Sequence, residues 1–182
     1  MKPPFSKLLP CVAAVVLAAG LHAPAASAPS EVSPTGFVVS LRHETKAAAR
    51  DLYRALGRIE QWWNASHSYS GKASNLSMPL QAGGCFCERW EQNSVEHARV
   101  VNAIENRLLR LSGALGPLQS LGVEGVLSFA IEEKDGRTTL DVTYRVAGPA
   151  TAGLDRLAAP VDSVIAEQAK RLVSFAETGR PE

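Results

Sequence analysis

The sequence lacks an excess of charge of either sign, a second long apolar run and the common catalytic motifs. Its 182 residues include 19 Lys and Arg against 18 Asp and Glu, without any basic run. This balance excludes the electrostatic surface typical of nucleic-acid-binding proteins. No nucleophile elbow (G-x-S-x-G), phosphate loop, dinucleotide-binding glycine motif or H-E-x-x-H motif occurs. The sequence therefore names no reaction, and we expect neither a nucleic-acid partner nor a cofactor.

Residues 1–28 have the layout of a secretory signal peptide. Lys2 and Lys7 precede an apolar run over 8–21, which is too short for a comfortable membrane span, and small residues follow it. We expect cleavage between Ala23 and Ala28, with an uncleaved anchor as the alternative. The mature protein should then be secreted, in the periplasm, and should carry no membrane span.

The rest of the chain suits a single domain. Residues 29–36 are rich in Pro and Ser and predict a flexible N-terminal segment before a domain over 37–178. Residues 37–45 are β-branched and apolar, as in a strand. Apolar residues then recur every three or four positions over 46–63, which predicts an amphipathic helix. Gly57 should break it, leaving a second short helix.

The second half of the chain predicts several strands and a closing helix. Five segments have the composition of strands: 85–92, 95–104, 107–113, 123–133 and 138–146. Asp135-Gly136 predicts a tight hairpin, so the strands on either side of it should be antiparallel. An apolar stripe from Leu154 to Phe175 predicts a long helix, with Pro160 at a kink or in a first turn. This order indicates an α+β fold.

The same order of elements resembles the helix-grip fold of the START-like, or SRPBCC, superfamily, which includes polyketide cyclases and activators of a heat-shock chaperone ATPase. The resemblance covers residues 37–177 and rests on five stretches: "WWNASHSYSG" (62–71), "GGCFCERW" (83–90), "VEHARVV" (95–101), "LRLSGALGPL" (109–118) and "VDSVIAEQAKRL" (161–172). It implies a curved antiparallel sheet wrapped around a long C-terminal helix, with two short helices after the first strand. It also implies a hydrophobic cavity between sheet and helix that binds a small hydrophobic or amphipathic ligand, either lipid-like or an aromatic metabolite.

Strand alternation sorts the residues that could face such a cavity. Leu127, Phe129 and Tyr144 lie on inner rows, and Gly125 leaves space for a ligand or for a close backbone approach. Further candidates lie on the predicted second short helix, in the polar stretch after it and on the closing helix: Trp62, Trp63, His67, Tyr69, Val164 and Gln168.

The strand over 85–90 contains a possible buried carboxylate. Phe86, Glu88 and Trp90 share one face, and two aromatic residues on that face suggest that it is the buried one. Glu88 would then lie in an apolar pocket with a raised pKa. The alternative is a bulge or rim position that leaves Glu88 in water.

Two histidines differ in their surroundings. His67 lies in the polar stretch "ASHSYSG", which suits the mouth of a cavity or, alternatively, a solvated loop. His97 alternates with Ala98 and Val100, so we expect it to face outward with Arg99. The alternative to simple ligand binding is a cyclase-like or hydrolase-like enzyme. It would use Glu88 or His67 as general acid or base and Tyr144 as a hydrogen-bond donor.

Cys85 and Cys87 allow three interpretations: structural thiols, a strained or redox-active disulfide, or a metal or redox centre. Neither cysteine stands at a recognised zinc spacing from His43, His67 or His97. Cα atoms at i and i+2 of a regular strand lie about 6.5–7 Å apart, at or beyond the disulfide limit, so a bridge would need a bulge. We therefore favour structural thiols on the face opposite Phe86, and no metal.

Overall fold

In the computed structural model of the protein, the described residues are 28–182, so the predicted signal peptide lies almost entirely outside them. One antiparallel sheet has the strand order β1-β2-β8-β7-β6-β5-β4-β3. Its strands are β1 (Ser30–Ser33), β2 (Gly36–Thr45), β3 (Leu76–Ser77), β4 (Cys85–Trp90), β5 (Asn93–Ile104), β6 (Leu108–Ser112), β7 (Glu124–Lys134) and β8 (Arg137–Ala147). Strand β1 lies within residues 29–36, the segment for which we expect flexibility, and it pairs with β2.

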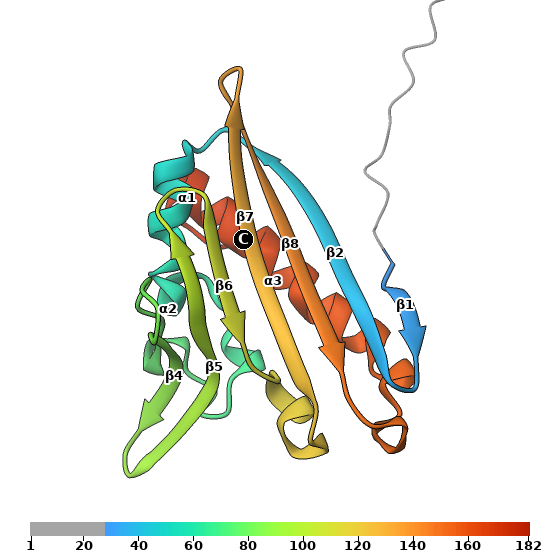
Figure 1. Cartoon of the computed structure of the whole chain (residues 1–182). Coiled ribbons are helices and arrows are strands. Elements are labelled where there is room, and N and C mark those ends of the chain that lie inside the picture. Colours follow the sequence, from blue (N-terminus) through green and yellow to red (C-terminus); the bar gives the residue numbers. More distant parts are fainter. Residues whose placement is uncertain (1–27) are drawn as a thin grey trace, which may run out of the picture.

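Two short helices, α1 (Ala49–Leu56) and α2 (Ile59–Trp62), follow β2, and α3 (Ala158–Thr178) ends the chain. Five 3₁₀ helices lie in the connections: η1 (Ala65–His67), η2 (Ala73–Asn75), η3 (Gly116–Leu121), η4 (Ala150–Ala152) and η5 (Leu154–Arg156). Figure 1 shows α3 crossing one face of the curved sheet, and α1 and α2 both pack against α3. The predicted α+β helix-grip architecture is confirmed.

The local signals in the sequence account for the element boundaries. Gly57 ends α1, and Pro160 lies in the first turn of α3, where a missing N–H is tolerated. In the β7–β8 hairpin, Asp135 and Gly136 have φ angles of 51° and 73°. Two positive φ angles are what a two-residue hairpin turn requires. Within residues 28–182, no helix combines the length and apolar character needed to cross a membrane.

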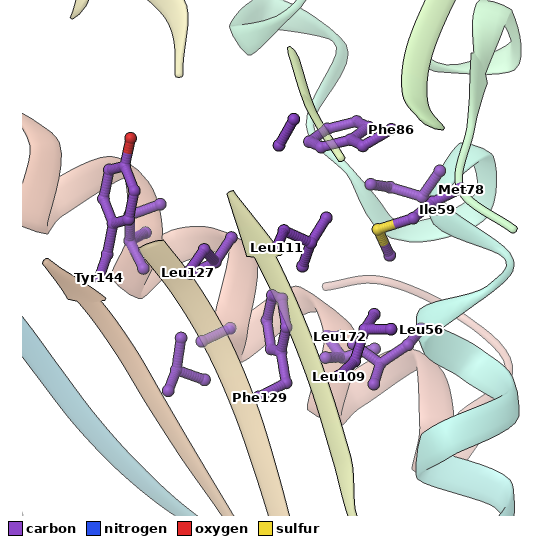
Figure 2. Packing of buried hydrophobic residues seen from close by; sticks show 14 of the residues in the cluster. Leu56, Ile59, Met78, Phe86, Leu109, Leu111, Leu127, Phe129, Tyr144 and Leu172 are labelled. Atoms are coloured by element: carbon purple, nitrogen blue, oxygen red, sulfur yellow. The ribbon is translucent and has the colours of Figure 1, made fainter. Parts of the chain in front are cut away.

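The main core lies between the sheet and α3. Leu109 and Leu111 of β6, Leu127 and Phe129 of β7, and Leu172 of α3 are all buried in it (Figure 2). Burial of each such side chain contributes on the order of 1.5–3 kcal/mol. This packing holds α3 against one face of the sheet.

Tyr144 belongs to this core and is fully buried. Its hydroxyl donates to the carbonyl oxygen of Gly113 at 3.1 Å and accepts from the backbone N–H of Leu115 at 2.9 Å. Burial raises the pKa of Tyr144 to about 12. A Cβ on Gly125 would lie 2.6 Å from the Tyr144 hydroxyl oxygen, so the missing side chain makes room for Tyr144. The close approach expected at Gly125 is therefore present, and the side chain of Tyr144 occupies the space beside this glycine.

Candidate ligand-binding site

A cavity of about 460 Å³ lies beside this core. Its walls come from Trp63 and residues 66–69, from Phe86 and His97 on β4 and β5, and from residues 115–117. Five residues around the start of α3 complete them: Leu157, Pro160, Val161, Val164 and Ile165. Apolar side chains dominate this lining. Both the volume and the apolar character are typical of small-molecule sites, which occupy about 300–1,000 Å³.

A bulge between β4 and β5 places a histidine in this apolar wall. Phe86 pairs with Ala98 and Cys87 pairs with Glu96, so His97 is an extra residue without a partner across the ladder. The extra residue interrupts the two-residue alternation, and both His97 and Ala98 point inward, at 5% and 3% exposure. The prediction that His97 faces outward with Arg99 is therefore wrong.

Glu88 lies behind His97 and has no exposed surface. It accepts hydrogen bonds from the backbone N–H of Tyr69 at 2.9 Å, from that of Ser70 at 2.5 Å and from Nε2 of His97 at 3.1 Å. Burial raises the pKa of Glu88, but the hydrogen bonds from Ser70, Tyr69 and His97 outweigh it and hold that pKa below its ordinary value. Of the two alternatives for Glu88, the buried position is the one observed, whereas the raised pKa expected with it is wrong.

The ring of His97 is fixed on two sides. Its centroid lies 4.7 Å from that of Phe86 and 5.8 Å from that of Tyr69. Burial lowers the pKa of His97, and the pairing with Glu88 only partly opposes this shift. A neutral ring that faces a carboxylate through Nε2 carries its proton on Nε2. The other ring nitrogen, Nδ1, then has a free lone pair and makes no hydrogen bond within the described part of the chain.

A second glutamate–histidine pair lies at the mouth of the cavity. Nε2 of His67 is 3.0 Å from Glu167 of α3, and the side chain of Asn64 donates to the same carboxylate. The backbone N–H of Asn64 also donates to the side-chain oxygen of Gln168 at 2.8 Å. These contacts attach residues 64–67 to α3, while Glu88 attaches residues 69 and 70 to the sheet.

The predicted ligand-binding residues divide into two groups. Five lie in the cavity wall: Trp63, His67, Tyr69, Phe86 and Val164. The other seven lie elsewhere: Trp62, Glu88, Trp90, Leu127, Phe129, Tyr144 and Gln168. Trp62 is fully buried core, with its indole N–H bonded to the carbonyl oxygen of Ala55 at 2.8 Å, and Trp90 is half-buried at the end of β4.

Several cavity residues were not predicted. His97 was not predicted because the alternation of apolar and polar residues along β5 does not reveal that the strand contains an extra residue. Leu115, Gly116 and Pro117 were missed because they precede or begin a short 3₁₀ helix, η3, without apolar periodicity. Val161 and Ile165 belong to the apolar stripe of α3, and their spacing from Val164 is the signal that could have identified them.

Cys85 and Cys87 form a disulfide, with their Cα atoms 5.2 Å apart. The bulge at Phe86 and Cys87 is the distortion that such a bridge requires. The interpretation that we favoured, two structural thiols, is therefore wrong. Glu96 lies close to both sulfurs, within 4.8 Å. Sulfurs bonded to each other are not the thiolates that a metal needs, so metal binding at this position would require reduction first.

Comparisons with known proteins identify the fold. No family model matches the sequence, and no curated protein matches it. Among solved structures, the chain is similar to a conserved protein of unknown function, EF2215, from Enterococcus faecalis. That match has 14% identity and a TM-score of 0.58, and covers 83% of this chain and 78% of the other.

Two further structures are similar to the chain. The Aha1 dimer from Colwellia psychrerythraea matches at 20% identity and a TM-score of 0.56, over 78% of this chain and 97% of the other. CalU16 from Micromonospora echinospora matches at 15% identity and a TM-score of 0.55, over 81% of this chain and 78% of the other. The chain thus has the START-like, or SRPBCC, fold that the order of its elements resembles. Identities this low establish the fold and not the activity.

Proposed function

We propose that this protein binds a small, mainly apolar ligand in the cavity between α3 and strands β4 and β5. The observation that carries the proposal is the cavity itself, about 460 Å³ in volume and lined mostly by apolar side chains. Proteins of the START-like fold commonly bind hydrophobic ligands, which agrees with this assignment. A lipid-like molecule or an aromatic metabolite fits the chemistry of the walls.

The loop over residues 64–70 lies at the mouth of the cavity. It supports binding because contacts within the protein hold it in place without a ligand. Trp63 lies in the wall with its indole N–H bonded to the carbonyl oxygen of His67 at 3.0 Å, and its ring meets Phe86 edge-on at 5.2 Å. Glu88 and Glu167 hold the two ends of the same loop. A preformed site loses little conformational entropy when its ligand binds.

The enzyme alternative that we considered from the sequence has weaker geometric support. It needs two of Glu88, His67 and Tyr144 to meet at one cavity. Only His67 of the three lies in the described cavity wall. The carboxylate of Glu88 is occupied by three donors, and the hydroxyl of Tyr144 is occupied by two backbone groups. We therefore prefer binding to catalysis by this set.

We further propose that the protein acts outside the cytoplasm, in the periplasm. The support is the basic, apolar and small-residue order of residues 1–28. A disulfide between Cys85 and Cys87 agrees with an oxidising compartment. Fractionation of cells that produce the full chain, with N-terminal sequencing of the recovered protein, tests the location and the cleavage together.

A cavity-filling variant tests the binding function. Val164 lines the cavity, whereas Ser163, the preceding residue of α3, is exposed and does not. We expect native mass spectrometry of the purified protein to detect a bound small molecule, and Val164→Trp to reduce its occupancy at least about 10-fold by filling the space. Ser163→Trp is the matched control and should retain the ligand. Equal occupancy in the two variants would contradict the proposed site.

A further inference from the structure

One ring nitrogen of a histidine in the cavity wall has no hydrogen-bond partner among the described residues, and it is not one of the fully buried atoms. His97 lies in the cavity wall, and its Nε2 is held by Glu88 at 3.1 Å. Its Nδ1 makes no hydrogen bond to the described residues. An acceptor at a largely apolar surface loses free energy unless something donates to it. A ligand that fills the cavity and excludes water would leave Nδ1 unsatisfied unless the ligand itself carries a donor.

Glu88 does more here than anchor the loop. Its bonds from the backbone N–H groups of Tyr69 and Ser70 hold residues 69 and 70 against β4. The third bond, to Nε2 of His97, fixes which ring nitrogen carries the proton. The aromatic rings of Phe86 and Tyr69 hold the imidazole plane, so both its orientation and its protonation are set before a ligand binds.

We propose that His97 is the specificity-determining polar group of the cavity: its Nδ1 accepts a hydrogen bond from an O–H or N–H of the ligand, and Glu88 is the positioning residue. This inference rests on the proposed binding function and adds a chemical requirement to it. The ligand is an apolar molecule that carries a hydrogen-bond donor at one point of its surface. Apolar molecules of equal size without a donor bind more weakly.

The protonation of His97 can be tested without any ligand. In protein labelled with ¹⁵N-histidine, long-range ¹H–¹⁵N spectra distinguish a protonated from an unprotonated ring nitrogen. His97→Phe identifies the His97 signals by their loss. At pH 7.5 we expect a proton on Nε2 and a bare Nδ1. We expect Glu88→Gln to give a mixture of tautomers, because an amide can either donate to Nε2 or accept from it. A protonated Nδ1 in the wild type would overturn the inference.

A matched pair of probes tests the ligand requirement. Naphthalene and 2-naphthol have the same ring system, and only 2-naphthol carries a donor. We expect equilibrium dialysis to show about 10-fold tighter binding of 2-naphthol, the upper end of what one net hydrogen bond contributes. His97→Phe should bring the ratio of the two affinities to 1 or below. His43→Phe is the control because His43 lies on β2, outside the cavity wall, and it should keep the wild-type ratio.

Each outcome of the dialysis has one meaning. If both probes bind wild type equally, or if His97→Phe keeps the preference, the requirement for a donor is wrong and the binding function stands. If neither probe binds wild type or His43→Phe, the proposed function is overturned together with this inference. If Glu88→Gln lowers the preference for 2-naphthol and leaves naphthalene binding intact, the positioning role of Glu88 is supported. An unchanged ratio of the two affinities in that variant would show that Glu88 only anchors the loop.

Discussion

The two glutamate–histidine pairs beside the cavity have the same chemistry and different surroundings. Glu88 and His97 have side chains that are 0% and 6% exposed, whereas those of Glu167 and His67 are 38% and 33% exposed. Both pairs have short N···O distances, 3.1 and 3.0 Å, and both carboxylates hold the loop over residues 64–70. The comparison shows that distance alone does not measure the importance of a pair. Solvent weakens the outer pair, Glu167 and His67. In the inner pair, Glu88 and His97, the carboxylate has no solvent to replace its partners.

Removal of the inner carboxylate should have the largest effect. Glu88→Ala leaves two backbone N–H groups and His97 without their buried acceptor, so we expect the free energy of unfolding to fall by about 3–5 kcal/mol. Glu167→Ala, the matched change at the mouth, should cost about 1 kcal/mol or less. Urea unfolding followed by tryptophan fluorescence measures both. Equal losses would show that burial does not distinguish the pairs.

Acid should destabilise the inner pair first. Burial lowers the pKa of His97, and also that of His43 on β2, from the ordinary value of 6.5. The folded state therefore binds protons less readily than the unfolded state, and stability is lost as pH falls below about 6.5. The loss is at most about 1.4 kcal/mol per pH unit for each group. The hydrogen-bonded carboxylate of Glu88, with its lowered pKa, adds a further loss only below about 4.5.

Unfolding measured between pH 7.5 and 5 tests this order. His97→Phe should show a shallower decline in stability than wild type, and His43→Phe combined with His97→Phe should be nearly flat. Both expectations follow because each variant removes a group that takes up a proton on unfolding. A wild-type slope in His97→Phe would mean that the buried histidine does not titrate in this window.

Opening the disulfide should disturb the inner pair and leave the outer pair unchanged. Cys87 neighbours Glu88, and its bulge places His97, whereas His67 lies in η1 and pairs with Glu167 of α3. We expect two more free thiols after reduction than before it, and a loss of about 1–2 kcal/mol in Cys85→Ser/Cys87→Ser, since the closed ring is short. The ¹⁵N signals of His97 should move on reduction while those of His67 stay in place. Movement of His67 alone would contradict this coupling.

The smallest effect should come from salt acting on the outer pair. At 0.5 M NaCl the Debye length is about 4 Å, so exposed charges are largely screened and buried ones much less. The stability difference between wild type and Glu167→Gln, at most about 1 kcal/mol, should therefore shrink as salt is added. The difference between wild type and Glu88→Gln should remain. Thermal unfolding at low and high salt measures both differences.

Local patterns in the sequence predicted most of the fold because each depends on neighbouring residues. Asp135-Gly136 can adopt the positive φ angles of a tight turn wherever it lies, and this predicted the β7–β8 hairpin. The apolar stripe from Leu154 to Phe175 predicted α3 in the same way, since residues three and four apart share one helical face. The buried face of β4 was also predicted, because Phe86 and Glu88 are two residues apart in a strand.

By itself, then, the sequence determined the strands, the closing helix and the apolar faces that bring them together. The tertiary structure alone decided which residues meet at the cavity. One extra residue in β5 turned His97 inward and bent β4 enough for the Cys85–Cys87 disulfide. Folding also brought Glu88 to the backbone of Ser70 and Tyr69, 18 and 19 positions away. Hydrogen bonds from Ser70, Tyr69 and His97 lower a pKa that burial alone would raise. Such contacts join residues that no repeat in the sequence relates, so the chemistry of the site emerges only when the chain has folded.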